Sequence, residues 1–265
     1  MSAPAEALEQ PGGSMTLVEH LTELRTRLIR SAIAVAAGAL VAWLVYQPIL
    51  NALLEPLRAS APKGSSIRQT LVTLDPLEPF AIRLKLATYG GLMLAMPVIL
   101  WQVWRFVEPG LYSNEKRYAV GFTACATLLF AMGAAIAFWT MPKALDWLRT
   151  IGGPNFTQLY GPAKYIKLIV YMMLAFGVGF EFPILVVFLQ LAGIVSTARL
   201  RSARRYVYVA IAVVVAVITP SGDPISMLAL TIPMWIFYEA AVVFGRLRER
   251  RRRKAEAAAA AAAAA

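Results

Sequence analysis

From Leu168 to Ile194 the sequence reads LIVYMMLAFGVGFEFPILVVFLQLAGI, with one ionisable side chain, Glu181, in its middle. A helix needs about 20 apolar residues to cross the ~30 Å hydrocarbon core of a bilayer. The stretch is longer than that requirement, so it predicts a transmembrane helix.

Five further stretches are almost free of charge: Leu28–Tyr46, Leu86–Val103, Ala119–Met141, Val207–Ile218 and Ile225–Phe244. As a helix, Val207–Ile218 would extend about 18 Å at ~1.5 Å per residue. The turn-rich segment Thr219–Pro224 separates it from the last stretch. We therefore predict an all-α polytopic membrane protein with six transmembrane helices, a short fifth span, and both termini on one side.

The composition supports a membrane protein. Hydrophobic residues make up 59% of the 265-residue chain and charged residues 15%, against ~45–50% and ~25% in soluble domains. The apolar excess excludes a disordered chain, and it argues against a nucleic-acid partner despite the net charge of +11. One cysteine, Cys125, excludes an internal disulfide framework, and one histidine, His20, excludes an HExxH zinc site. We expect no cofactor and no metal.

The distribution of basic residues predicts which loops face the cytoplasm. Cytoplasmic loops are enriched in Lys and Arg, and more of these residues fall on the side of the termini, most densely in Arg199–Arg205 and Arg246–Lys254. We therefore expect both termini in the cytoplasm. Met1–Ser14 has acidic residues but no basic one, unlike a signal or transit peptide, so the first span is expected to act as its own insertion signal.

The chain divides into three parts. Residues 1–14 are expected to be a flexible tail, residues 15–246 the membrane domain, and residues 247–265 a basic, alanine-rich cytoplasmic tail near anionic lipid. Met15–Leu28 carries leucines on one face and predicts an amphipathic helix at the membrane interface. Gln47–Lys85, with five prolines in its sequence, is expected to be the longest outer loop.

Two carboxylates fall inside predicted spans, where charge is costly. Glu181 lies at the middle of its span, and Pro183 would free backbone carbonyls nearby. Glu239 lies nearer the inner end of the last span. Each is either a functional group facing a polar cavity or a structural group that hydrogen-bonds to a neighbouring helix.

Two more carboxylates lie among basic residues on the inner side: Glu23 in the amphipathic segment and Glu115 in the loop after the second span. Taken singly, each is expected to be a solvated surface group. Together they would form a cation site that suits guanidinium, which a carboxylate binds through two parallel hydrogen bonds that Lys cannot match. Phe106 and Tyr112 would add apolar contact.

Motifs along the chain resemble the TatC family, the multi-spanning receptor subunit of the twin-arginine protein translocase. They include His20-Leu-Thr-Glu-Leu-Arg-Thr-Arg27, Pro79-Phe80, Phe106-Val-Glu-Pro-Gly-Leu-Tyr-Ser-Asn-Glu115, Phe176-Gly-Val-Gly-Phe-Glu-Phe-Pro183, Ile218-Thr-Pro220, Ile232-Pro-Met234 and Tyr238-Glu239. The resemblance covers roughly residues 15–246.

The resemblance implies a translocase subunit in the bacterial cytoplasmic membrane and not an enzyme. Such proteins bind the paired arginines of signal peptides on folded cargo, recruit single-span TatA/TatB-type subunits, self-associate, and draw on the proton-motive force. The implied shape is a curved, glove-like wall of helices. By position, Glu23, Glu115, Phe106 and Arg25 would bind the signal peptide, Glu181 would be the polar residue of the concave face, and Pro56 a proline of the first outer loop.

The last outer turn departs from the family pattern. It reads Thr219-Pro220-Ser-Gly-Asp223 where the family often has Thr-Pro-Pro-Asp, and Met227 stands where a glutamine is often found. Thr219, Pro220 and Asp223 are therefore treated as structural residues of this turn.

Two other function classes were weighed. A proton-coupled secondary transporter would use Glu181 as its coupling carboxylate, but the sequence shows no inverted repeat. An intramembrane protease would need catalytic groups within the spans, and the three aspartates Asp75, Asp146 and Asp223 all fall in predicted outer loops.

Overall fold

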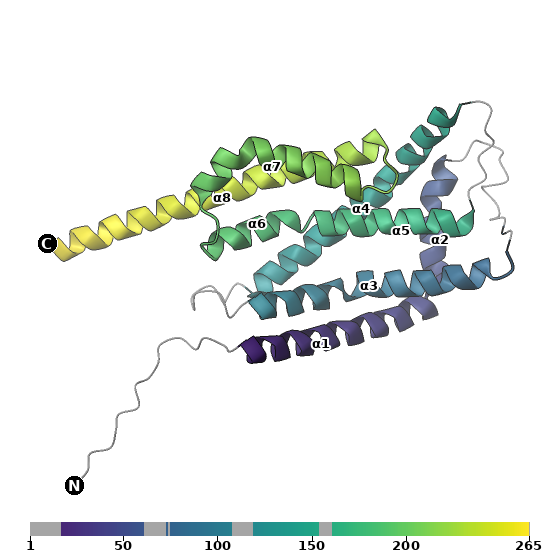
Figure 1. The fold of residues 1–265 in the computed structure, drawn as a ribbon, viewed down its shortest axis with the longest axis horizontal. Coiled ribbons are helices and arrows are strands. Elements are labelled where there is room, and N and C mark those ends of the chain that lie inside the picture. The colour runs from purple at the N-terminus through teal and green to yellow at the C-terminus, as the bar shows by residue number, and fades with distance from the viewer. Residues whose placement is uncertain (1–16, 61–72, 74, 108–118, 154–160, 265) are drawn as a thin grey trace, which may run out of the picture.

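The computed structural model describes residues 17–60, 73, 75–107, 119–153 and 161–264, and the described parts are helical and contain no strand. The helices are α1 (Leu17–Leu44), α2 (Tyr46–Ser60), α3 (Glu78–Val107), α4 (Ala119–Gly152), α5 (Pro162–Gly179), α6 (Phe182–Leu191), α7 (Thr197–Ile218) and α8 (Pro224–Ala264). Figure 1 shows that α1 runs alongside α3, and that α5 and α6 follow one another along a common line. Helix α7 packs against α8, which extends beyond the rest of the bundle. The all-α prediction is confirmed.

Five segments among the described residues are long and apolar enough to cross a membrane: Val18–Leu44, Glu78–Phe106, Val120–Gly152, Pro162–Leu191 and Pro224–Ala262. The predicted fifth span lies in α7 but is not among these five segments. The first turns of this 22-residue helix carry Arg199, Arg201, Arg204 and Arg205. Its apolar part is therefore short, as the sequence indicates.

Two segments differ from their sequence-based interpretation. Residues 47–60, expected at the start of the outer loop Gln47–Lys85, belong to α2, whose Leu53, Leu54 and Leu57 are buried. The amphipathic segment before the first span continues into that span as one helix, α1, because no glycine or proline interrupts the sequence between Leu17 and Leu28. The amphipathic face is therefore the first part of a spanning helix and not a separate interfacial one.

The α1–α3 contact depends on glycine. A Cβ added at Gly38 would lie 2.7 Å from the carbonyl oxygen of Gly91, and one at Gly91 would collide with the backbone of Ala39. Small residues allow helix backbones to approach closely in membranes, where dispersion and hydrogen bonds replace the hydrophobic driving force. This contact fixes the position of α1 on α3.

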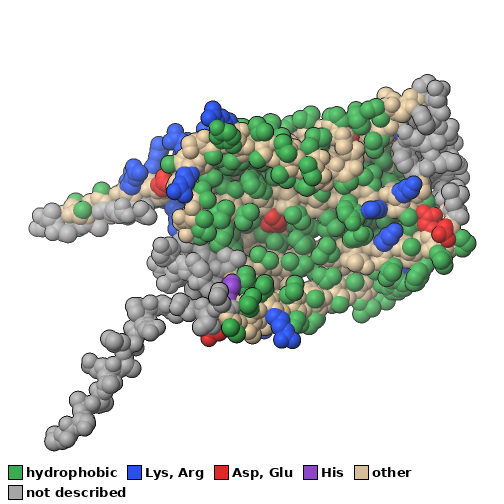
Figure 2. All heavy atoms as spheres, in the orientation of Figure 1, with side chains coloured by type: hydrophobic (Ala, Val, Ile, Leu, Met, Phe, Trp, Pro, Cys, Tyr) green, Lys and Arg blue, Asp and Glu red, His purple; other side chains and the backbone are tan. Residues whose placement is uncertain are grey.

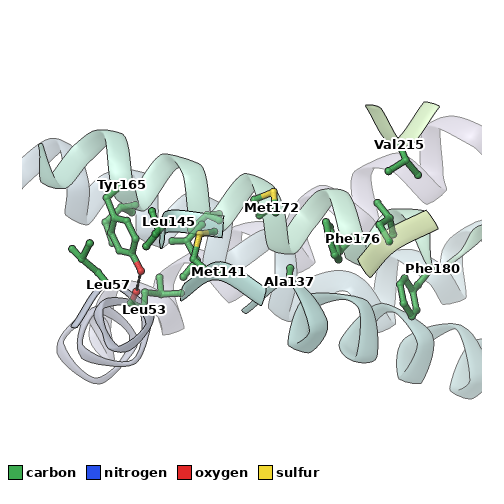
Figure 3. Packing of buried hydrophobic residues seen from close by; sticks show 14 of the residues in the cluster. Leu53, Leu57, Ala137, Met141, Leu145, Tyr165, Met172, Phe176, Phe180 and Val215 are labelled. Carbon is green, nitrogen blue, oxygen red and sulfur yellow. Dashed lines mark hydrogen bonds between the residues drawn. The ribbon is translucent and has the colours of Figure 1, made fainter. Parts of the chain in front are cut away.

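The main core lies where α2, α4, α5 and α8 meet. Figure 3 shows Tyr165 of α5 among Leu57, Met141 and Leu145. The Tyr165 hydroxyl donates to the carbonyl oxygen of Leu53 (2.6 Å), so the buried tyrosine also holds α2 in place. Phe176 and Phe180 continue the core toward α8 and are fully buried.

Candidate functional site

The first candidate lies at the N-terminal end of α1, where Glu23 forms an ion pair with Arg27 one turn later. The distance from Arg27 Nη2 to Glu23 Oε1 is 2.7 Å, and the side chains are 16% and 18% exposed, respectively. Arg27 Nη1 donates a second hydrogen bond to Gln102 Oε1 of α3 at 3.2 Å. Glu23 Oε2 is buried and accepts no hydrogen bond within the described structure.

A second α1–α3 contact lies one turn earlier. The His20 ring stacks on the Phe106 ring with 4.4 Å between centroids and 23° between planes. Phe106 is one residue before the end of α3, so this stack packs the last turn of α3 against the first turn of α1. We use "α1–α3 site" for His20, Glu23, Arg27, Gln102 and Phe106.

An apolar groove continues from this site along the two helices. Its volume is about 390 Å³. Arg27, Gln102 and Phe106 contribute to its wall, and the rest of the lining is apolar apart from Ser31: Leu24, Leu28, Ala32, Val35, Ile99 and Val103. An apolar ligand segment attached to a cation would find both kinds of surface here.

The other predicted binding residues are not all brought together. Arg25 is exposed and lies two residues from Glu23, on a different side of α1. Glu115 and Tyr112 lie outside the described residues, so their distances to Glu23 stay untested. In the sequence, both residues follow the end of α3 at Val107.

Glu181 lies at the break between α5 and α6. The Glu181 carbonyl accepts from the Leu185 amide (3.1 Å), and Pro183 is in the first turn of α6. Both carboxylate oxygens are buried and accept no hydrogen bond from the described residues. Figure 2 shows an acidic side chain surrounded by hydrophobic ones in the area of the α5–α6 junction. A buried carboxylate in this environment could accept a hydrogen bond from a partner molecule or bind a proton.

Glu239 has a different environment. Its Oε2 accepts from Arg204 Nη2 (2.5 Å) and its Oε1 from the Tyr208 hydroxyl (2.6 Å). Arg204 and Tyr208 are one turn apart on α7, so Glu239 of α8 joins the two helices. We use "α7–α8 cluster" for Arg204, Tyr208 and Glu239. Of the two roles considered for Glu239, this geometry fits the structural one.

The turn before α8 is held by its own side chains. Thr219 is buried, and its hydroxyl donates to the carbonyl of Val215 (2.7 Å). Asp223 is fully buried and accepts from the Ser226 amide (2.7 Å) and from the Ser221 hydroxyl, which is the pattern of a helix N-cap. Pro220 is exposed. Pro56 is buried within α2.

Sequence reasoning missed two of the residues that complete these sites. Gln102 was not singled out, although an amide within the apolar stretch Leu86–Val103 is a usable signal. Tyr208 was also missed, although its spacing of four from Arg204 places both on one face of a helix. The described residues contain no cluster of three or more His, Cys, Asp or Glu that would hold a metal ion.

Comparisons with known proteins agree with the motifs. A family model described as "Sec-independent protein translocase protein (TatC)" matches residues 19–233. Curated proteins named Sec-independent protein translocase protein TatC are similar to this chain over most of its length. That of Frankia casuarinae is 39% identical over 243 residues, 89% of this chain and 67% of the relative, and that of Corynebacterium kroppenstedtii is 33% identical over 92% of this chain and 64% of the relative. That of Aquifex aeolicus is 38% identical over 89% of this chain and 97% of the relative.

This chain therefore spans about two thirds of the length of the first two relatives and nearly all of the third. A crystal structure of "Twin Arginine Translocase Receptor- TatC", determined in DDM, superposes with a TM-score of 0.71 at 36% identity. The match covers 86% of this chain and 99% of that one.

Proposed function

This chain belongs to the TatC family of Sec-independent protein translocase proteins, and on that premise we propose that it is the receptor subunit that binds the paired arginines of signal peptides on folded cargo. The observation that carries the proposal is the buried Oε2 of Glu23, which lies beside an apolar groove and has no hydrogen-bond donor among the described residues. Buried acceptors are rarely left without a donor, so an unoccupied one at a surface groove suggests a ligand.

The chemistry of the ligand follows from the acceptor. A guanidinium has five N–H donors in a planar fork, so it can satisfy the free oxygen of Glu23 and a second carboxylate at the same time. We propose Glu115 as that second carboxylate, Phe106 as the apolar wall, and Arg25 as a further contact with the peptide. The apolar part of the signal peptide would follow the α1–α3 groove.

The multi-pass architecture is that of a membrane protein. We place it in the bacterial cytoplasmic membrane with both termini in the cytoplasm, because Lys and Arg concentrate on that side. Residues 15–246 would form the six-span domain, α7 being its short fifth span, and residues 1–14 and 247–265 the cytoplasmic tails. The proposed role of the basic segment Arg246–Lys254 is contact with anionic lipid.

The remaining steps of transport need partners. We propose that single-span TatA/TatB-type subunits and further copies of this chain assemble with the receptor, and that the proton-motive force drives transport. Glu181 is the proposed intramembrane polar contact. Pro56, Thr219, Pro220, Asp223 and Glu239 would keep the outer turn, α2 and the α7–α8 packing in the geometry that assembly requires.

One observation favours a second function: neither carboxylate oxygen of Glu181 has a hydrogen-bond donor among the described residues. A proton-coupled secondary transporter would use such a carboxylate. Its test is uptake of small cations into liposomes that contain this chain and no other protein. We expect no saturable uptake, since the motifs and relatives are those of a protein translocase.

The test of the receptor proposal is peptide binding to the purified full-length chain. A twin-arginine signal peptide should bind at least ~10-fold more tightly than its twin-lysine version, since bidentate pairing is lost in the latter. Glu115→Ala should lower affinity for the twin-arginine peptide by a similar factor. Equal binding of both peptides, or normal binding by a folded Glu115→Ala protein, would contradict the proposal.

A further inference from the structure

Arg27 connects the proposed receptor carboxylate to a second helix. One terminal nitrogen of its guanidinium donates to Glu23 Oε1 on α1 and the other donates to Gln102 Oε1 on α3. The two acceptors lie on different helices, at 2.7 Å and 3.2 Å from their donors. The guanidinium is therefore held from both sides, and it holds Glu23 by one oxygen.

Gln102 is the fixed end of this connection. Its side chain is 9% exposed in an apolar part of α3, between Trp101 and Val103. Burying an amide without a hydrogen bond is costly, so the pairing with Arg27 favours one orientation of the Gln102 side chain. The α1–α3 backbone contact at Gly38 and Gly91 further limits movement of one helix along the other.

Glu23 lies between this connection and the His20–Phe106 stack. His20 is three residues before Glu23 and Arg27 four residues after it, so all three lie on one face of α1. Both His20 and Arg27 contact α3. The carboxylate is thus fixed along α1 on both sides, with Oε1 occupied by Arg27 and Oε2 without a donor in the part of the chain that the structure describes.

We propose that Arg27 and Gln102 are positioning residues of the signal-peptide site: they hold Glu23 by Oε1 so that Oε2 faces the incoming guanidinium. This inference rests on the proposed receptor function. A carboxylate has about four lone-pair sites, so it can accept from Arg27 and from a peptide arginine together. Lysine cannot replace Arg27, because one ammonium group does not reproduce the fork that reaches both acceptors.

The experiment measures the affinity of a labelled twin-arginine signal peptide for the full-length chain in detergent. Gln102→Leu and Arg27→Lys should each weaken binding by about 10-fold, by analogy with metal sites, where loss of a hydrogen bond that orients a ligand side chain costs about 10–100-fold in affinity. Gln102→Glu retains the acceptor and should bind within ~3-fold of the unchanged protein. Arg30→Lys is the matched control, since Arg30 is exposed on the same helix, and it should bind normally.

A double-mutant cycle separates positioning from general stability. In a Glu23→Gln background, Gln102→Leu should cause no further loss of affinity, because Gln102 acts through Glu23. Equal losses in both backgrounds would overturn the positioning role. If Gln102→Leu does not fold, the same cycle is measured with Arg27→Lys, which retains the positive charge.

The failures are distinguishable. If Glu23→Gln weakens binding while Arg27→Lys and Gln102→Leu bind normally, the positioning role is wrong and the receptor proposal stands. If Glu23→Gln itself binds like the unchanged protein, Glu23 is not the receptor group, and the positioning role is wrong with it.

Discussion

Two carboxylates of this protein form ion pairs with arginine where two helices meet: Glu239 pairs across α7 and α8, and Glu23 pairs with Arg27 on its own helix, α1. In the α7–α8 cluster, Arg204 and Tyr208 each donate a hydrogen bond to one of the two carboxylate oxygens of Glu239. In the α1–α3 site, Arg27 occupies one oxygen of Glu23, and the other is buried and has no donor within the described residues. The first arrangement is complete in itself, whereas the second leaves one acceptor without a donor among the described residues. An arginine partner is therefore common to both carboxylates; under the proposed function, the occupancy of the second oxygen is what separates the structural Glu239 from the binding Glu23.

The largest loss of peptide binding is expected from disrupting the contact between α1 and α3. Gly91→Leu would drive a side chain into the backbone of Ala39 and separate α1 from α3. Overpacking typically costs about 1–3 kcal/mol and more where backbone must move. We expect loss of detectable signal-peptide binding and a lower unfolding temperature in detergent.

The control for that substitution is Gly121→Leu in α4, where an added Cβ has no atom within 4 Å. It should leave both properties near normal. Tight peptide binding by the Gly91→Leu protein would show that the α1–α3 contact does not support the site.

Exchanging each carboxylate for its amide tests the comparison directly through binding. Glu23→Gln should weaken the twin-arginine peptide by roughly 30-fold, since a hydrogen bond to a charged group contributes about 1.5–3 kcal/mol. Glu239→Gln should bind normally because both oxygens already serve α7. The measurement is a peptide titration by fluorescence anisotropy, and equal losses in the two variants would remove the distinction.

The same two variants should reverse their order in stability. Glu239→Gln weakens two contacts between α7 and α8, and we expect a loss of about 1 kcal/mol because the pair is partly exposed. Glu23→Gln should cost less, since Oε2 has no contact to lose and the amide oxygen can still accept from Arg27. Denaturant unfolding of both proteins checks this order, and Tyr208→Phe should reproduce part of the Glu239→Gln loss. A larger stability loss for Glu23→Gln would assign it the structural role.

Much of the architecture could be predicted from sequence because long apolar stretches carry a strong signal. The stretches around Leu28–Tyr46, Leu86–Val103 and Leu168–Ile194 are all in spanning helices. Helix α2 was missed because its two prolines, Pro48 in its first turn and Pro56 in its interior, favour a loop assignment. Its burial depends on contacts with distant residues such as Tyr165, which no local pattern contains.

The carboxylate of the candidate site could be predicted from the sequence, but the residue on α3 that holds its arginine partner could not. Glu23 stood out as an acid among bases, and its pair with Arg27 follows from a spacing of four on a helix. The hydrogen bond from Arg27 to Gln102 joins residues 75 positions apart, so it depends on the packing of α1 on α3. For the same reason, the sequence did not separate the role of Glu239 from that of Glu181.

The central claim is that Glu23 contacts a guanidinium of the signal peptide. The most direct test pairs Glu23→Gln with an arginine-to-lysine exchange in the peptide and measures all four dissociation constants. The account predicts that the unchanged protein discriminates between the two peptides and that the Glu23→Gln protein loses most of this discrimination, while Glu239→Gln retains it. If Glu23→Gln weakens both peptides by the same factor, the two groups are not coupled and the claim is wrong.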